Sequence, residues 1–266
     1  MRFYSPLACA AFRGLKSSIS SIHNSKGMTM RKLAICLALA GTALAGPALA
    51  KDKSWYIGIE AGPNLMQNQG YDIANAAGTT RVKDGITQNY AVGYDVGGNI
   101  GYDFGPFRAE FALNYNRNNV RNTTIEQGIP AINYSAAVNG PSILGAPPLG
   151  VNSNAGGNVE ALSFMVNGLA DFGGQDGEWG GYLGAGAGIA RVTQGQQALN
   201  APGAVFLNDS DTSFAWQVLA GVYKPINDHI DIGLKYRFFS VPQVDTFTTN
   251  GLSVNSRYRS HSLLLT

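Results

Sequence analysis

Apolar and polar residues alternate along much of the chain after Lys51, and a period of two is typical of half-buried β-strands. The clearest stretch is residues 90–103, where Tyr, Val and Ile alternate with Gly, Asn and Asp. Residues 107–116 repeat the pattern after a turn at Asp103–Pro106. Taken together, the pattern predicts eight strands, which cover residues 56–61, 90–103, 107–116, 162–172, 183–189, 213–222, 230–238 and 257–266.

The links between these strands alternate in length. Short links fall at 103–106, 173–178 and 224–229, and long polar links at 66–86, 117–157, 193–211 and 240–256. An even number of antiparallel strands with alternating short turns and long loops is the layout of an outer-membrane barrel. In hydrocarbon every backbone N–H and C=O group must be bonded internally, so a sheet can span a membrane only when it closes on itself. We therefore expect an all-β fold, an eight-stranded antiparallel transmembrane up-and-down β-barrel.

Aromatic residues near the predicted strand ends suit the two girdles that flank the apolar band of such a barrel. They are Trp55, Tyr90, Tyr102, Phe104, Tyr115, Phe172, Trp179 and Phe238. The competing interpretation is a soluble eight-stranded barrel of the lipocalin type, which would bury its apolar face inside. Loop alternation, the Tyr-rich apolar face and the scarcity of Lys favour the membrane barrel.

Composition agrees with this fold class. Only 14% of the residues are charged, against about 25% in an average soluble domain. The chain is rich in Gly and aromatic residues, its mean hydropathy is −0.04, and it has one long apolar run. These values exclude a disordered chain, a helical membrane protein and a coiled coil.

Residues 1–50 carry six basic residues and no acidic residue. Arg31 and Lys32 precede the apolar stretch 33–45, and a small-residue end follows, so we expect a secretory signal that is cut after Ala50. Residues 28–50 or 30–50 form the expected signal, and residues 1–27 an over-long start. Both cysteines, Cys9 and Cys36, precede the cut, so residues 51–266 contain none. Their formal net charge is 13 − 17 = −4.

Four segments resemble the OmpA-like and opacity-type small barrels of Gram-negative outer membranes. They are residues 54–58 (SWYIG), 101–110 (GYDFGPFRAE), 164–168 (FMVNG) and 181–186 (GYLGAG). The resemblance implies outer-membrane lipid, lipopolysaccharide and the barrel-assembly machinery as partners. Two features differ from the family: no residues remain for a periplasmic peptidoglycan-binding domain, and the chain ends in Leu-Leu-Leu-Thr rather than an aromatic residue. The second suggests truncation in the last strand.

Charged residues on the polar faces are the main candidates for a site. We expect an eight-stranded barrel to hold little more than side chains, so inward charges should pair across its lumen. The predicted network comprises Glu60, Arg108, Glu110, Glu160, Lys235 and Arg237. Such a network would either plug the barrel or line a narrow, porin-like ion path.

Other chemistry is sparse. His261 lies between Ser260 and Ser262, which point to the opposite face of a strand, so a nucleophilic pair of the kind found in lipid-modifying barrel enzymes is not supported. We expect no catalytic residue, cofactor, metal site or nucleic-acid partner. Arg257 and Arg259 are placed to contact lipopolysaccharide phosphates. The long segment 117–157 suggests recognition of an extracellular ligand, because loops of this length are usually functional or disordered.

Overall fold

The computed structural model describes residues 53–266, apart from 76, 80, 127, 174–178 and 228. The expected signal peptide, residues 1–50, lies outside the described residues, as do its start and its cleavage site. Among the residues described, no helix is long and apolar enough to cross a bilayer.

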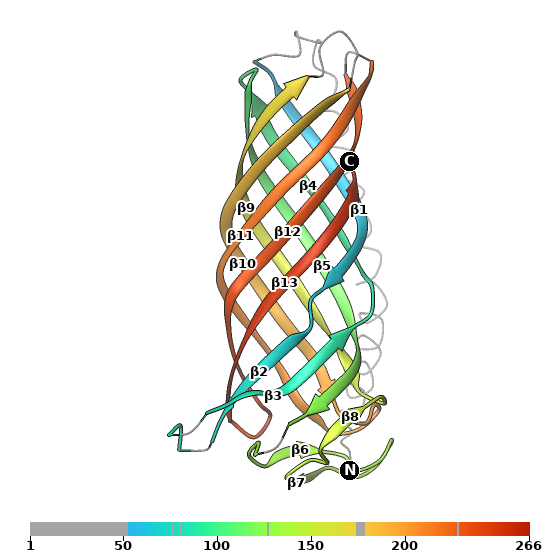
Figure 1. Ribbon diagram of the computed structural model, residues 1–266, viewed down its shortest axis with the longest axis vertical. Coiled ribbons are helices and arrows are strands. Elements are labelled where there is room, and N and C mark those ends of the chain that lie inside the picture. Colours follow the sequence, from blue (N-terminus) through green and yellow to red (C-terminus); the bar gives the residue numbers. More distant parts are fainter. Residues whose placement is uncertain (1–52, 76, 80, 127, 174–178, 228) are drawn as a thin grey trace, which may run out of the picture. The chain divides into compact units, whose positions relative to one another are not determined.

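Eight strands close an antiparallel ring, which confirms the predicted fold class (Figure 1). Neighbouring strands of the ring follow one another along the chain, and the last pairs with the first, with Leu265 opposite Ala61. The ring consists of β1 (Trp55–Met66), β4 (Gly93–Asp103), β5 (Phe107–Ile125), β9 (Gly156–Gly173), β10 (Gly180–Ala198), β11 (Val205–Asn227), β12 (Ile230–Phe247) and β13 (Ser253–Leu265).

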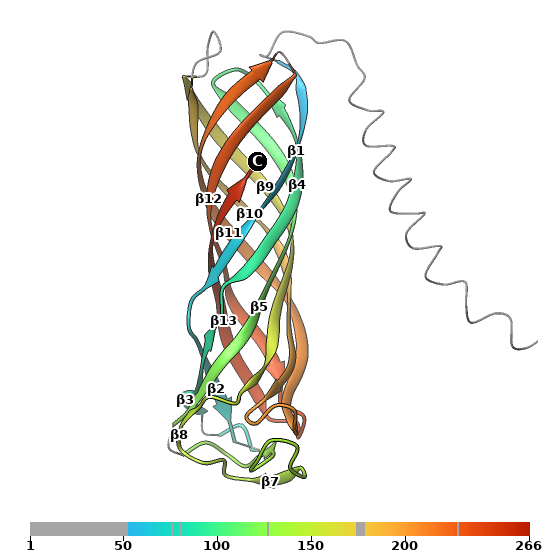
Figure 2. The same ribbon diagram turned by 90° about the vertical axis from the view of Figure 1, so that its right-hand side faces the viewer.

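Five short strands gather at the end of the barrel opposite the short turns (Figures 1 and 2). The hairpin of β2 (Gln69–Ala74) and β3 (Arg81–Tyr90) continues the wall beyond β1 and β4, because β2 pairs with β13 and β3 with β5. The strand β8 (Gly150–Asn152) pairs with β5, and β6 (Ile132–Tyr134) pairs with β7 (Ile143–Gly145). We call residues 126–155, which contain β6, β7 and β8, the cap.

Several strands of the ring are longer than a membrane requires. A transmembrane strand needs about 9–11 residues, whereas β11 has 23 and β5 and β10 have 19 each. Outward apolar side chains such as Ile57, Phe111, Phe164 and Leu183 are exposed, and they lie in the half of the barrel near the short turns. We call this half the membrane half and the remainder the extension.

The extension reverses the polarity of the wall. Buried apolar side chains fill its interior in two clusters. The first includes Val192, Phe239 and Val241, and the second packs residues of the cap such as Ile132 against the strands, with Phe206 among them. The wall of the extension is therefore built like a soluble barrel, with its apolar face inside.

All four predicted long links are wrong in length. Residues 66–86 contain β2 and the start of β3, while 193–211 and 240–256 consist mainly of the continued strands β10 to β13. Within 117–157, β5 continues to Ile125 and only the cap connects it to β9. Apart from Phe247, the wall strands within these segments lack the strongly exposed outward apolar residues that marked the strands of the membrane half, as expected where an outer face meets water.

The aromatic girdle is present at the short-turn end, where Trp55, Phe104, Phe172 and Trp179 are all more than half exposed. The prediction that Tyr90 belongs to an aromatic girdle is wrong, because its hydroxyl lies inside the barrel. It is 2.9 Å from the hydroxyl of Tyr71 and donates to Gln69 Oε1 at 3.1 Å. It therefore belongs to the packed interior.

Candidate functional site

A four-residue ion network lies at mid-height in the lumen. Lys235 Nζ donates to Glu60 Oε2 at 2.6 Å, and Arg237 Nη1 lies 3.6 Å from Glu60 Oε1. Arg237 also pairs with Asp95. All four residues are buried, and their formal charges cancel. We call Glu60, Asp95, Lys235 and Arg237 the lumen network.

Neutral side chains add hydrogen bonds to the two carboxylates of the lumen network. Asn114 donates to Glu60 Oε1 at 2.5 Å, and the hydroxyl of Ser262 donates to Asp95 Oδ2 at 2.6 Å. Glu60 projects from β1, Asp95 from β4 and the two cations from β12, so the network joins the first and last hairpins of the ring. Its geometry fits a cross-brace that holds the closed ring together.

Arg108 and Glu110 also point inward, but they make separate contacts nearer the short turns. Arg108 donates to both carboxylate oxygens of Asp171, at 2.8 and 2.5 Å, and its guanidinium lies 4.8 Å from the ring centre of Tyr182. Glu110 accepts hydrogen bonds from Tyr56 at 2.8 Å and from Asn167 at 3.3 Å. The predicted charges therefore form two tiers rather than one network.

The inward placement of Glu160 is wrong. Glu160 shares its face of β9 with Leu162 and Phe164, which are exposed to the outside. Its carboxylate pairs with Arg117 on β5 at 2.9 Å, and the two side chains are 27% and 39% exposed. Because alternate residues of a strand point to one face, Glu160 lies on the outer wall of the extension.

Inward glycines make room for the long polar side chains of the lumen. A Cβ atom at Gly97 would lie 2.0 Å from Asn114 Nδ2, and one at Gly186 would lie 2.0 Å from Asn167 Oδ1. Larger residues at these positions would displace side chains that contact Glu60 and Glu110. The glycine content of the polar face thus follows from the packing of the lumen.

His261 lies on the outer face, at the edge of the membrane half that borders the extension. Its Nε2 is 2.8 Å from Gln67 Nε2, and its Nδ1 is 2.8 Å from the hydroxyl of Tyr236. Its ring also packs against Phe238, with centroids 5.1 Å apart. Ser260 and Ser262 point inward and are buried, so they form no pair with this imidazole.

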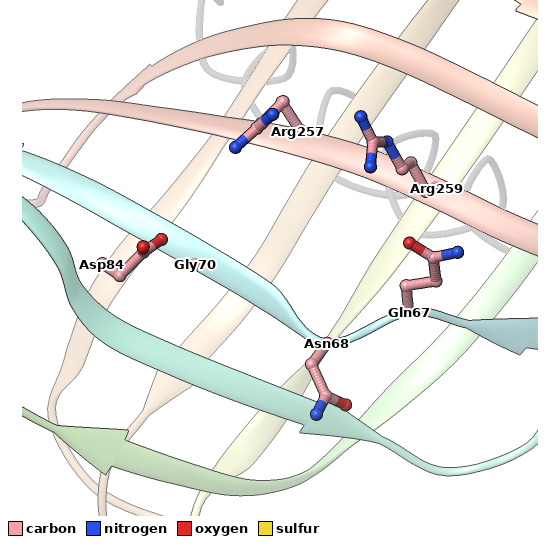
Figure 3. A pocket seen from close by; sticks show the side chains of 6 residues that line it. All are labelled: Gln67, Asn68, Gly70, Asp84, Arg257 and Arg259. Atoms are coloured by element: carbon pink, nitrogen blue, oxygen red, sulfur yellow. The ribbon is translucent and has the colours of Figure 1, made fainter.

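Arg257 and Arg259 also lie on the outer wall, where they line a pocket with residues that sequence analysis assigned to a loop (Figure 3). The other lining residues are Gln67, Asn68, Gly70 and Asp84. Sequence analysis missed two acidic residues of the lumen. Asp95 and Asp171 lie at inward positions of their strands, but they were not identified as the partners of Arg237 and Arg108. No group of three or more His, Cys, Asp or Glu within the described residues could hold a metal ion.

Comparison with solved structures returns small surface barrels of Gram-negative bacteria. Neisserial surface protein A is 17% identical, with 80% of this chain and 98% of that chain covered and a TM-score of 0.37. The outer membrane protein OprG of Pseudomonas aeruginosa is 10% identical, with 80% and 95% covered and a TM-score of 0.49. Ail, the attachment invasion locus protein of Yersinia pestis, solved in complex with a heparin analogue, is 10% identical, with 77% and 98% covered and a TM-score of 0.28.

No curated protein matches the chain. The family model for the outer membrane protein beta-barrel domain matches residues 34–259, which is most of the sequence. The match agrees with the closed ring, with the apolar outer face of its membrane half and with the resemblance to small Gram-negative barrels. The chain therefore belongs to the outer membrane protein β-barrel family.

Proposed function

We propose that this outer-membrane barrel acts as a rigid, non-conducting scaffold that presents its cap to an extracellular ligand. The observation that carries the proposal is the two-sided structure of the cap. Ile129, Ile132 and Tyr134 are buried in the apolar core of the extension, whereas Leu144 and Val151 are 64% and 70% exposed. One face thus closes the barrel while the other presents apolar side chains to the exterior.

The chemistry of the cap supports recognition rather than simple solvation. No charged residue occurs from position 127 to 159, and Leu149 is a third strongly exposed apolar residue, at 63%. Exposed apolar side chains that gather in one segment often mark an interaction site. The ligand that suits this surface is a neutral, largely apolar one.

A porin-like channel is the alternative, and the interior packing weighs against it. Phe239, Val241 and Tyr258 have no exposed surface, and they lie between the lumen network and the cap. A water-filled path would have to pass this apolar layer. The charges of the lumen network are better explained as structural pairs.

The proposal extends to a non-enzymatic role. His261 on the last strand contacts Gln67 and Tyr236 on the outer wall, whereas the adjacent Ser260 and Ser262 are buried inside the barrel. Export by a signal that is cut after Ala50, assembly by the barrel-assembly machinery and contact with lipopolysaccharide remain part of the proposal. In outer-membrane barrels the short turns face the periplasm and the long loops face the exterior. By this rule the cap lies outside the cell.

Cell-surface display tests the role of the cap. Gram-negative cells carrying the parent barrel are measured for self-aggregation and for adhesion to plastic coated with serum proteins. The triple variant L144N/L149N/V151N should lose the activity that the parent shows. Phe247→Asn is the matched control, because Phe247 is 57% exposed at the end of β12 and lies outside the cap. Equal activity in the parent and the triple variant, or activity that survives proteolytic removal of the cap, would refute the proposal.

A further inference from the structure

The outer wall is interrupted where β1 ends at Met66 and β2 begins at Gln69. A pocket of about 160 Å³ lies at this break, between β13 on one side and β3 on the other (Figure 3). Arg257 and Arg259 line it from β13, Gln67 and Asn68 from the break, and Asp84 from β3. The pocket therefore combines two cations, two amides and one carboxylate.

The two guanidinium groups are not engaged in ion pairs with described residues, although the carboxylate of Asp84 lines the same pocket. Within the part of the chain that the structure describes, neither Arg257 nor Arg259 makes an ion pair, whereas Arg117 on the outer face of β5 is paired with Glu160. Arg257 and Arg259 are two residues apart on β13, so both project outward. Two adjacent unpaired arginines form a site suited to bidentate binding of a phosphate group.

The pocket lies at the level where lipid headgroups are expected. On β13 the outward residues run from Leu265 and Leu263, which are exposed and apolar, through His261 to Arg259. On β1 the outward apolar series ends at Leu65, opposite His261, and Gln67 N donates to Arg259 O at 2.9 Å. Two residues advance a strand by about 7 Å, so the arginines begin within one or two such steps of the apolar surface.

The far wall of the pocket is held in an unusual backbone conformation. Asp84 has a φ of 49°, which is uncommon for a residue other than Gly, and its N–H donates to Asp72 Oδ1 at 2.8 Å. A Cβ atom at Gly70 would lie 1.9 Å from Asp84 Oδ1, so a larger residue at this position would displace that carboxylate from its place over β2. The carboxylate of Asp84 therefore lies opposite the two arginines, where it can accept a hydrogen bond.

We propose that this pocket binds the phosphate group of a phosphorylated glycolipid headgroup in the outer leaflet, with its acyl chains along Leu65 and Leu263. Arg257 and Arg259 contact the phosphate, and Asp84 accepts a hydrogen bond from a sugar hydroxyl or amine of the same headgroup. The inference deepens the lipid contacts of the proposed function and rests on placing the cap end outside the cell. It does not depend on what the cap binds.

The test measures binding of diphosphoryl lipid A to the refolded full-length barrel in detergent micelles, by native mass spectrometry. R257Q/R259Q removes two charge-assisted contacts and should weaken binding at least about tenfold. The matched control R121Q/R191Q removes the same charge from exposed positions on β5 and β10, and should bind as the parent does. A heat-modifiable gel shift establishes that each variant is folded.

Two further arms identify the ligand. Dephosphorylated lipid A should bind at least about tenfold more weakly than the diphosphoryl form, and inorganic phosphate should fail to displace the lipid at equimolar concentration. Equal losses in R257Q/R259Q and R121Q/R191Q would overturn the pocket in favour of general electrostatic attraction. Displacement by inorganic phosphate alone would overturn the lipid as the ligand.

Asp84→Asn separates the two walls of the pocket. It should keep phosphate affinity, while discrimination between lipid A and a phosphorylated lipid without sugar falls. Unchanged discrimination would overturn the role of Asp84. The cap variant L144N/L149N/V151N should bind lipid A as the parent does, so failure of this inference and failure of the proposed function are distinguishable.

Discussion

Replacing Glu60 by Gln tests whether the lumen network holds the ring closed. Glu60 is 5% exposed, and its carboxylate contacts Lys235 Nζ at 2.6 Å and Arg237 Nη1 at 3.6 Å. Glu60→Gln leaves two buried cations with only Asp95 as a counter-charge. Removing one partner of a buried pair costs about 3–5 kcal/mol, because the remaining charge stays desolvated. We expect a loss of this size in the free energy of unfolding.

Two comparisons isolate the cause of that loss. Glu160→Gln breaks the ion pair with Arg117 on the outer wall, where partial exposure limits the expected cost to about 0–1 kcal/mol. The double variant E60Q/K235M restores a neutral lumen, and should recover much of the stability lost in E60Q. The pattern of one large loss, one small loss and one recovery is specific to a buried network.

Equilibrium unfolding in urea measures these differences, with each protein refolded into phospholipid vesicles. Tryptophan fluorescence reports unfolding, because Trp55 and Trp179 are strongly exposed on the outer wall. If E60Q lost no more stability than E160Q, the lumen network would not be the cross-brace we infer. Failure of E60Q/K235M to recover stability would refute the charge argument and leave lost packing as the cause.

Three further predictions concern the lumen, the wall and the extension. In planar bilayers the purified protein should show no stepwise conductance, because the apolar layer around Phe239 fills the lumen, and steady single-channel steps would contradict this packing. Gly188→Ala should destabilise the barrel by about 1–3 kcal/mol in urea unfolding, since its Cβ would lie 2.0 Å from a backbone oxygen of β9, whereas Gly168→Ala meets nothing within 4 Å and should be neutral. Hydrogen bonds from Asn255 and from a neighbouring glutamine lower the pKa of Asp245 below its usual 3.8. The stabilisation is therefore present above pH 3.8 and lost as the pH falls through the lowered pKa, so N255A should be less stable than the parent at pH 6 and should match it in strong acid.

The sequence predicted strands well in the membrane half and poorly in the extension, for a physical reason. In β10 the outward Ile189 is exposed, whereas the next large apolar residue, Val192, is inward and fully buried. The apolar residues change face between these positions, because the surroundings of the wall change from lipid to water. A search for outward apolar residues therefore ends at this level although the strand continues to Ala198.

The sequence predicted which charged side chains of the candidate site point inward, but it did not predict which of them form ion pairs. Strand alternation placed Glu60, Lys235 and Arg237 inside, as observed. The same alternation would have placed Glu160 outside with Leu162, so that error was avoidable from the sequence. Which inward acid meets which cation depends on strand stagger across the lumen, and the stagger of a barrel is not encoded in the alternation of a single strand.

The outer pocket could not be predicted, because it arises from three local features that lie in a predicted loop. The wall breaks after Met66, Gly70 lacks a side chain, and Asp84 adopts a positive φ. None of these has a distinctive sequence pattern. Arg257 and Arg259 were visible as outward cations, but the residues opposite them became neighbours only through pairing of β2 with β13.

The membrane barrel and the water-soluble barrel, which competed as interpretations of one sequence, occupy successive halves of the same strands. This arrangement has a functional consequence. From Phe214, which is exposed in the membrane half, β11 continues without interruption to Val205 near the cap, and this rise corresponds to roughly 20 Å for a tilted strand. A cap carried on flexible loops could bind only at the cost of ordering them. A cap packed on the apolar core of a continuous wall is already ordered, so its exposed face can retain a fixed distance and orientation from the lipid headgroups below it.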